Sequence, residues 1–124
     1  MTLARATRPG YHTVTSRIVV GDVAGQVAFL RAVFGATGEV VAGRPAEVAI
    51  GDSLVMITAP TERELFAAFL YMYVDDADAT YAAALAAGAT AIEEPKDTPY
   101  GDRRAMVRDP FGNVFQIAHV LTSA

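Results

Sequence analysis

The chain has 124 residues, which is enough for one domain with a hydrophobic core of its own. Its composition, 52% hydrophobic and 19% charged, excludes a disordered chain, and its net charge of −4 argues against a nucleic-acid partner. The absence of cysteine excludes disulfides and favours a cytoplasmic location.

The N-terminal segment, residues 1–12, is expected to be a flexible leader ahead of one domain, residues 13–120. The leader carries two arginines but no apolar run, so it indicates neither a signal peptide nor a membrane anchor. We therefore expect no membrane partner.

The first half of the domain, residues 13–59, predicts a strand, a helix and three further strands. Residues 14–20 have the alternation of a strand, and a helix is expected over residues 23–34, between an N-capping Asp22 and a terminating Gly35. The strings EVVAG, AEVAIGDS and LVMITA follow, and each predicts a short strand beside a glycine turn.

A polar stretch, residues 60–64, is the predicted linker to a second unit, residues 65–120, which repeats the order of the first. Its predicted elements are a strand at 69–74, a helix begun by Asp76 or Asp78 and ended by Gly88, and strands at 90–93, 104–108 and 114–120, with a long loop over 94–102. The sequence therefore predicts an α+β fold of two tandem β-α-β-β-β modules.

A module of this kind has one helix, which covers one face of its strands and leaves the other face for a cavity. Strand alternation predicts which side chains line that cavity. On the first strand they are Thr15, Arg17 and Val19. On the strand that opens the second module they are the aromatic residues Phe69, Tyr71 and Tyr73.

Several strings occur in the order typical of a known family: VVGD and AVFGA around the first helix, then AEVAIGDS, YVDDADA, LAAGAT, YGDR and VRDPFGN. On these strings the chain resembles the vicinal oxygen chelate superfamily, which includes glyoxalase I, extradiol dioxygenases and the bleomycin and fosfomycin resistance proteins. It is most similar to the PhnB-like branch. The resemblance implies a glyoxalase-like fold, with a concave mixed sheet around a small-molecule site and helices outside, in a homodimer.

Family members that use a metal place His or Glu at four cavity-facing points. By the neighbouring motifs these points fall here at Thr15, at Val55 or Met56, at Phe69 and at Gln116. None of these side chains is a good ligand for a divalent metal, which draws on imidazole, carboxylate or thiolate. We therefore expect no metal and no other cofactor, although a metal held at a non-standard position stays an alternative.

Arg17 is a candidate anchor for a carboxylate, a phosphate or a polarised carbonyl, and an ion pair with Glu47 or Asp102 is the competing interpretation. Glu47 itself is a candidate base, although a lone glutamate on a strand is more often solvated or paired. Both interpretations stay open for each residue.

The aromatic row of Phe69, Tyr71 and Tyr73 suits stacking on a planar ligand, with the hydroxyls as directional donors. Ordinary packing in the core or in a dimer interface is the alternative. Val19 and Gln116 complete the predicted ligand-binding set, with Gln116 as a hydrogen-bonding group.

These residues favour metal-independent binding of a hydrophobic, aromatic small molecule in the cavity of a homodimer. By resemblance to the bleomycin resistance proteins, this binding would serve antibiotic sequestration and resistance. Two alternatives stay open: a glyoxalase-type lyase, isomerase or dioxygenase that depends on a divalent metal, and a metal-free enzyme that uses Glu47 or Tyr71 as a base. The sequence leans toward a binding protein without deciding whether there is catalysis.

Overall fold

The computed structural model describes residues 7–60 and 64–122. Its elements follow the repeating order that the sequence predicted. In chain order they are β1 (Ser16–Val19), α1 (Val23–Phe34), β2 (Ala46–Ile50), β3 (Ser53–Thr58), β4 (Phe69–Tyr73), α2 (Ala77–Ala86), β5 (Thr90–Asp97), β6 (Asp102–Arg108) and β7 (Val114–Val120).

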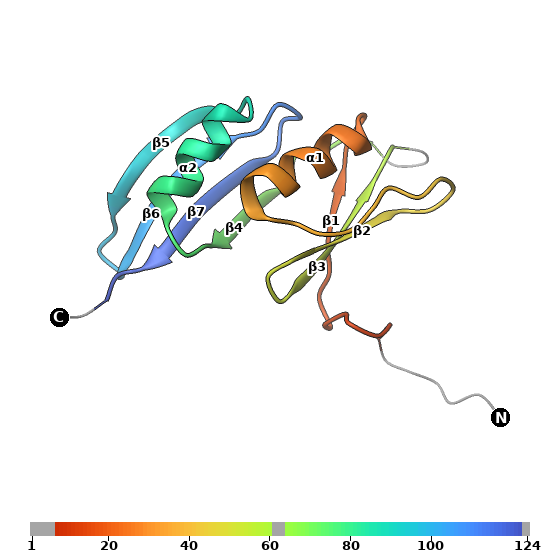
Figure 1. Cartoon of the computed structure of the whole chain (residues 1–124), viewed down its shortest axis with the longest axis horizontal. Coiled ribbons are helices and arrows are strands. Elements are labelled where there is room, and N and C mark those ends of the chain that lie inside the picture. Colours follow the sequence, from red (N-terminus) through yellow and green to blue (C-terminus); the bar gives the residue numbers. More distant parts are fainter. Residues whose placement is uncertain (1–6, 61–63, 123–124) are drawn as a thin grey trace.

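The strands form two separate sheets that lie side by side (Figure 1). The first module forms a three-stranded sheet in the order β1-β3-β2, and the second a four-stranded sheet in the order β4-β7-β6-β5. In each module the first strand pairs in parallel with the last, and the remaining pairs are antiparallel. The α+β fold of two tandem modules is confirmed, but its mixed sheet is in two parts.

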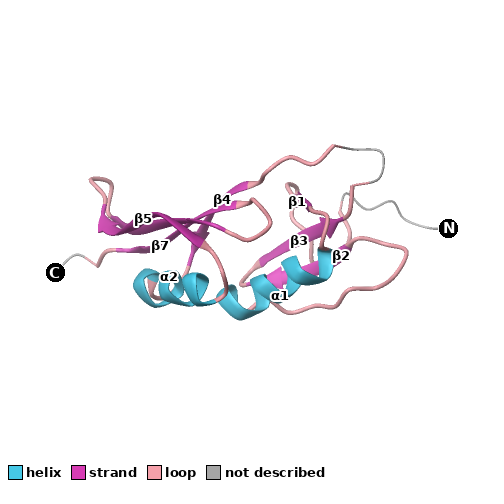
Figure 2. Cartoon of the chain, turned by 90° about the horizontal axis from the view of Figure 1, so that it is seen from above, coloured by secondary structure: helices cyan, strands magenta, loops and turns pink. Residues whose placement is uncertain are grey.

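Both helices lie on the same side of the two sheets (Figure 2). Their buried residues and those of the strands share one core, which includes Leu30 of α1, Ile18 and Ile57 of the first sheet, and Phe115 and Ile117 of the second. Neither of the two described helices lies on the opposite face of a sheet, as one helix per module requires (Figure 2). We call this helix-free face the open face.

The predicted strand EVVAG is not formed. Antiparallel pairing begins with a single bridge between Thr37 and Ala49 and goes no further. The next residue, Gly38, has φ 126° and packs so closely on β2 that a Cβ would lie 2.4 Å from the carbonyl oxygen of Glu47. The chain turns away at this point, and Val40 and Val41 stay exposed. The first module therefore has three strands.

The second module differs in the length of β5. This strand extends to Asp97, with irregular pairing against β6 between Ala91 and Glu93 and between Glu93 and Lys96. Strand β6 begins at Asp102, two residues earlier than predicted. The predicted loop over residues 94–102 is therefore shortened to residues 98–101.

The helix caps act as their sequence positions indicate. The side chain of Asp22 accepts a hydrogen bond from the backbone N–H of Gly25 (2.9 Å), and Gly35 ends α1 in the left-handed region with φ 68°. At α2 the cap is Asp76, which accepts from the N–H of Ala79 (3.1 Å). The alternative cap, Asp78, pairs instead with Arg103 on β6.

A buried polar cluster joins the two modules. Gln26 of α1, which has no exposed surface, donates through Nε2 to Oδ2 of Asp109 (2.8 Å) and accepts from Nδ2 of Asn113 (2.8 Å). Asp109 also accepts from the N–H groups of Phe111 and Asn113, which fixes the turn before β7. The turn sequence DPFGN therefore positions α1 against the second module as well as shaping its own backbone.

Residues 1–6 of the predicted leader and residues 61–63 of the predicted linker lie outside the described residues. The rest of the leader contacts the first module, since Arg8 pairs with Glu47 (3.2 Å) and the ring of His12 lies 3.3 Å from the carbonyl oxygen of Asp52. None of the helices that the structure describes has the length and apolar character needed to cross a membrane.

Candidate ligand-binding site

The aromatic residues of β4 lie on the open face of the four-stranded sheet. Their neighbours Leu70 and Met72 pack on the core beneath the helices, so the alternating residues face the other way. Phe69 is 65% exposed, Tyr71 37% and Tyr73 64%. The sheet therefore presents an aromatic row on its open face, the orientation that strand alternation predicted.

Strand register brings further residues to this face. Gln116 of β7 pairs directly with Tyr71 on one side and with Met106 of β6 on the other, so all three side chains point the same way. In the next row, Tyr73 pairs with Ala118, which pairs with Arg104. Ala118 is fully buried, so the larger side chains beside it on this face cover it.

Asp102, at the start of β6, holds both tyrosines of the row. The residue is only 5% exposed, and its Oδ2 accepts from the hydroxyl of Tyr71 at 2.6 Å and from that of Tyr73 at 2.9 Å. The two rings lie 5.2 Å apart at 56°. Asp102 therefore fixes two aromatic rings in a tilted pair while the ring faces stay accessible.

These contacts keep both hydroxyls protonated. The loss of hydration around its hydroxyl, together with the hydrogen bond to Asp102, raises the pKa of Tyr71 far above its ordinary value. The hydrogen bond to Asp102 is the main cause that raises the pKa of Tyr73. Both residues therefore act as hydrogen-bond donors, and Tyr71 is poorly suited to act as a base.

Tyr100 and Arg104 extend the network away from Asp102. The hydroxyl of Tyr100 lies 3.2 Å from that of Tyr71 and accepts from Nη1 of Arg104 at 2.8 Å. These two contacts lower the pKa of Tyr100. The other end of the guanidinium donates to Oε2 of Glu93 at 3.0 Å. Sequence reasoning used YGDR as a family string and considered Asp102 only as a partner of Arg17. A strand that begins at Asp102 would have placed Asp102 and Arg104 on this face.

The predicted residues of the first module lie on the open face of the other sheet. Arg17 pairs in register with Met56, which pairs with Glu47, so these side chains share one face. Arg17 is exposed, and it forms no ion pair with any residue in ranges 7–60 and 64–122. The competing interpretation, an ion pair of Arg17 with Glu47 or Asp102, is not formed in the single chain, because Glu47 pairs with Arg8 and Asp102 accepts from tyrosines.

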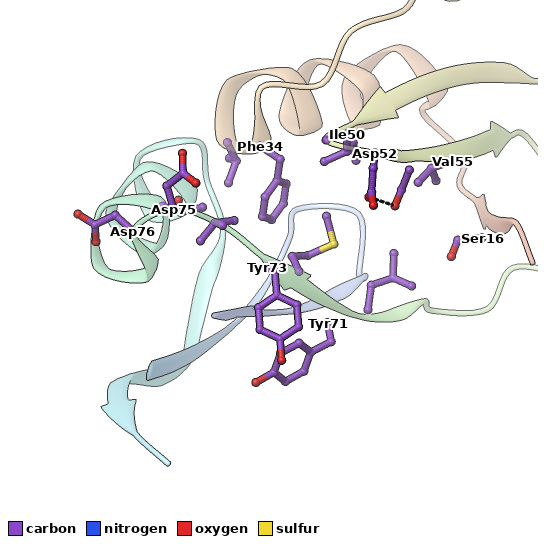
Figure 3. Close-up of a pocket in the computed structure, with 16 residues that line it drawn as sticks. Ser16, Phe34, Ile50, Asp52, Val55, Tyr71, Tyr73, Asp75 and Asp76 are labelled. Carbon is purple, nitrogen blue, oxygen red and sulfur yellow. Dashed lines mark hydrogen bonds between the residues drawn. The ribbon is translucent and has the colours of Figure 1, made fainter. Parts of the chain in front are cut away.

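A cavity of about 630 Å³ opens between the two modules (Figure 3). Strand β4 lines it, Tyr71 and Tyr73 included, and Phe34 lines it from the end of α1. The rings of the two tyrosines lie on the opposite side of β4 from Phe34 (Figure 3). Asp52 and Asp75 add carboxylates from the turns beside β3 and β4. A different cavity contains the predicted residues Arg17 and Val19, so the single chain does not bring them together with the tyrosines.

The donors at the family's metal-binding points do not fit a divalent metal. Thr15, Phe69 and Gln116 offer at best a hydroxyl or an amide, and Val55 is buried beneath α1. Across the residues that the structure describes, no group of three or more His, Cys, Asp or Glu side chains is arranged to hold an ion. Of the histidines, His119 accepts through Nδ1 from the N–H of Ala77 (2.8 Å) and so supports the start of α2.

Comparison with solved structures shows the same fold in other proteins. The chain is similar to TioX from Micromonospora sp. ML1, with a TM-score of 0.74 and 23% identity over 86% of this chain and 97% of TioX. It is also similar to a glyoxalase/bleomycin resistance protein/dioxygenase family enzyme from Burkholderia phytofirmans PsJN. The TM-score is 0.73 and the identity 28%, over 86% of this chain and 97% of that one.

Comparison of sequences supports the same assignment. The chain is 50% identical over 48 residues to the Mycobacterium bovis protein named "Putative glyoxylase CFP32", and the match covers 39% of this chain and 18% of that relative. The chain thus spans less than a fifth of that relative's length. The model of the Glyoxalase/Bleomycin resistance protein/Dioxygenase superfamily matches residues 10–117. The chain belongs to this superfamily.

Proposed function

We propose that the protein binds a hydrophobic, aromatic small molecule on the open face of its four-stranded sheet, without a metal. The observation that carries this proposal is the tyrosine pair fixed by Asp102. Tyr71 and Tyr73 keep accessible ring faces while their hydroxyls are held at 2.6 and 2.9 Å from one carboxylate oxygen. Such fixed rings stack on a planar ligand with little further loss of conformational entropy.

We further propose that two copies of the chain form the complete cavity. Leu65, Phe66 and Phe69, at the entry to β4, are each at least 60% exposed, and an apolar group of this kind on a folded chain is typical of an interface. In a two-fold dimer, the first sheet of one copy would face the second sheet of the other. Arg17, Val19 and Glu47 of one copy would then lie opposite the tyrosines and Gln116 of the second.

In this arrangement the biological role would be sequestration of an aromatic compound, and resistance to an aromatic antibiotic is the role we favour. The superfamily name includes the bleomycin resistance proteins, which makes this role compatible with the family. Placement in the PhnB-like branch stays a prediction of the sequence.

The two catalytic alternatives receive less support from the side chains. Tyr71 donates a hydrogen bond to Asp102 and has a raised pKa, and Glu47 is paired with Arg8, so neither residue is prepared to act as a base. A metal-dependent reaction would need ligands other than those at the family's usual points. Binding is therefore the function that this geometry supports best.

The test is titration with prodan, a neutral naphthalene probe whose fluorescence changes when it leaves water. Replacing both Tyr71 and Tyr73 with Ala should weaken prodan binding by about tenfold or more, since each aromatic contact contributes on the order of 1 kcal/mol. Leu85→Ala, which removes an exposed apolar side chain from α2 on the helix side, is the matched control. Equal affinity in the tyrosine double variant and the control would refute the proposal.

A further inference from the structure

A second cavity lies at the end of the three-stranded sheet where β1 and β3 finish and α1 begins. Its volume is about 500 Å³, within the range typical of small-molecule sites. Its apolar walls include Val19 at the end of β1, Val23 at the start of α1, and Val40 and Pro45 in the segment before β2. Strands β1 and β3 run parallel, and the carboxyl ends of parallel strands are a common position for ligands in α/β sheets.

Two arginines give this cavity its charge. Among the residues that the structure describes, Arg17 and Arg44 line it, and no acidic residue does. Within the described parts of the chain, neither guanidinium forms a salt bridge or a side-chain hydrogen bond.

Most other arginines of the described chain are engaged. Arg8, Arg103 and Arg104 each pair with a carboxylate, and Arg31 donates to the carbonyl oxygen of Gly38. The cavity therefore combines an apolar surface with two guanidiniums that have no partner among the described residues.

We infer that this cavity binds a small organic anion, with an apolar body against the valines and a carboxylate directed to Arg17 and Arg44. Guanidinium groups match carboxylates in both charge and planar geometry, and they are more weakly hydrated than ammonium groups. The apolar walls exclude a purely hydrophilic anion such as inorganic phosphate as the best occupant, because burying the valines requires an apolar group.

In the single chain this site is separate from the aromatic row of β4, but in the proposed dimer Arg17 would face that row across the two copies, so the inference rests on the proposed function. All of its lining residues belong to the first module of one chain, and none belongs to the tyrosine network. The inference therefore extends the proposed function. It assigns a negative charge to the ligand, whereas the tyrosine face indicates only that the ligand is aromatic. Arg17, predicted from strand alternation alone, is joined here by Arg44, which sequence reasoning did not single out.

The experiment compares 2-naphthoate with the neutral 2-naphthylmethanol by isothermal titration calorimetry on the full chain. We expect 2-naphthoate to bind about tenfold more tightly than the alcohol, as one or two charge-assisted hydrogen bonds would provide. In the Arg17→Gln, Arg44→Gln double variant, affinity for 2-naphthoate should fall about tenfold while affinity for the alcohol changes by less than about twofold.

Two control variants make the result specific. Arg108→Gln removes an exposed arginine from β6 of the other sheet, and it should leave 2-naphthoate binding unchanged. The Tyr71→Ala, Tyr73→Ala variant should weaken prodan binding by about tenfold or more but keep the preference for 2-naphthoate over the alcohol, so failure of one proposal is distinguishable from failure of the other.

Three outcomes would overturn the inference. The first is equal affinity for 2-naphthoate and 2-naphthylmethanol. The second is an equal loss of 2-naphthoate binding in Arg108→Gln and in the Arg17→Gln, Arg44→Gln variant. The third is no binding of 2-naphthoate at millimolar concentration.

Discussion

Asp102 determines the chemistry of the open face, because one nearly buried carboxylate oxygen accepts both tyrosine hydroxyls. A tyrosine whose pKa is raised by folding holds its proton more tightly in the folded chain than in the unfolded one. Its contribution to stability is therefore complete below the unfolded pKa of about 10 and is lost as pH rises above that value. The raised pKa values of Tyr71 and Tyr73 both act in this direction.

Asp102→Asn should weaken this pH dependence. The amide carries no charge to strengthen the hydrogen bonds, so the pKa values of Tyr71 and Tyr73 should fall toward the ordinary value and the loss of stability above about pH 10 should become shallower. Urea unfolding across this pH range measures the effect. Asp97→Asn is the control, because Asp97 is exposed and contacts Arg103 rather than a tyrosine. If the free energy of unfolding of Asp102→Asn falls with pH above about 10 as steeply as that of the wild type, Asp102 does not set the pKa values of Tyr71 and Tyr73.

Tyr100 should behave in the opposite way. Its contacts with Tyr71 and Arg104 lower its pKa, so it should ionise before Tyr71 and Tyr73, whose pKa values are raised. Ultraviolet absorbance of tyrosinate during a pH titration should show a first step that is missing in Tyr100→Phe and retained in Tyr81→Phe. If Tyr100→Phe keeps the first step, the contact between Tyr100 and Arg104 is not formed in solution.

At the scale of the elements, the sequence predicted the parts that depend on neighbouring residues. Asp22 and Gly35 bound α1, and β7 occupies the residues predicted for it, because caps and alternation act within a few residues. The predicted strand over residues 39–43 was wrong, because the close packing of Gly38 on β2 turns the chain away. That contact is not local, and no short window of sequence contains it.

In the candidate site, too, the sequence predicted what depends on neighbouring residues and missed the contacts between distant strands. Alternation on β4 was sufficient to place Phe69, Tyr71 and Tyr73 on the open face. The role of Asp102 was missed because β7 lies between β4 and β6, so the tyrosines and their acceptor meet only when the sheet order is known. The separation of Arg17 from the tyrosines likewise follows from the division into two sheets.

The packing of α1 on the second module depends on Gln26. Gln26→Leu keeps the side-chain size but leaves a buried carboxylate oxygen of Asp109 and an amide N–H of Asn113 without their partners. The variant should lose about 2–4 kcal/mol of stability in urea unfolding. Gln116→Leu on the open face is the matched control and should lose less than about 1 kcal/mol. If the two variants are equally stable, the buried cluster does not join the modules.

At the scale of the whole molecule, exposed apolar residues around the entry to β4 predict a homodimer. Light scattering during size-exclusion chromatography should give twice the 13.1 kDa mass of one chain. Phe66→Glu places a charge on a side chain that is 64% exposed in the single chain, and it should shift the mass toward that of a monomer. A monomeric mass for the wild type at high concentration would mean that one chain forms its sites alone.

The most direct test of the central claim is an amide chemical-shift map of the chain titrated with prodan. We expect shifts at Phe69–Tyr73 of β4 and at the neighbouring residues of β6 and β7, including Gln116, since these share the open face of one sheet. Shifts confined to the helices, or to the cavity of Arg17 and Arg44, would contradict it and remove the tyrosine row from the binding site.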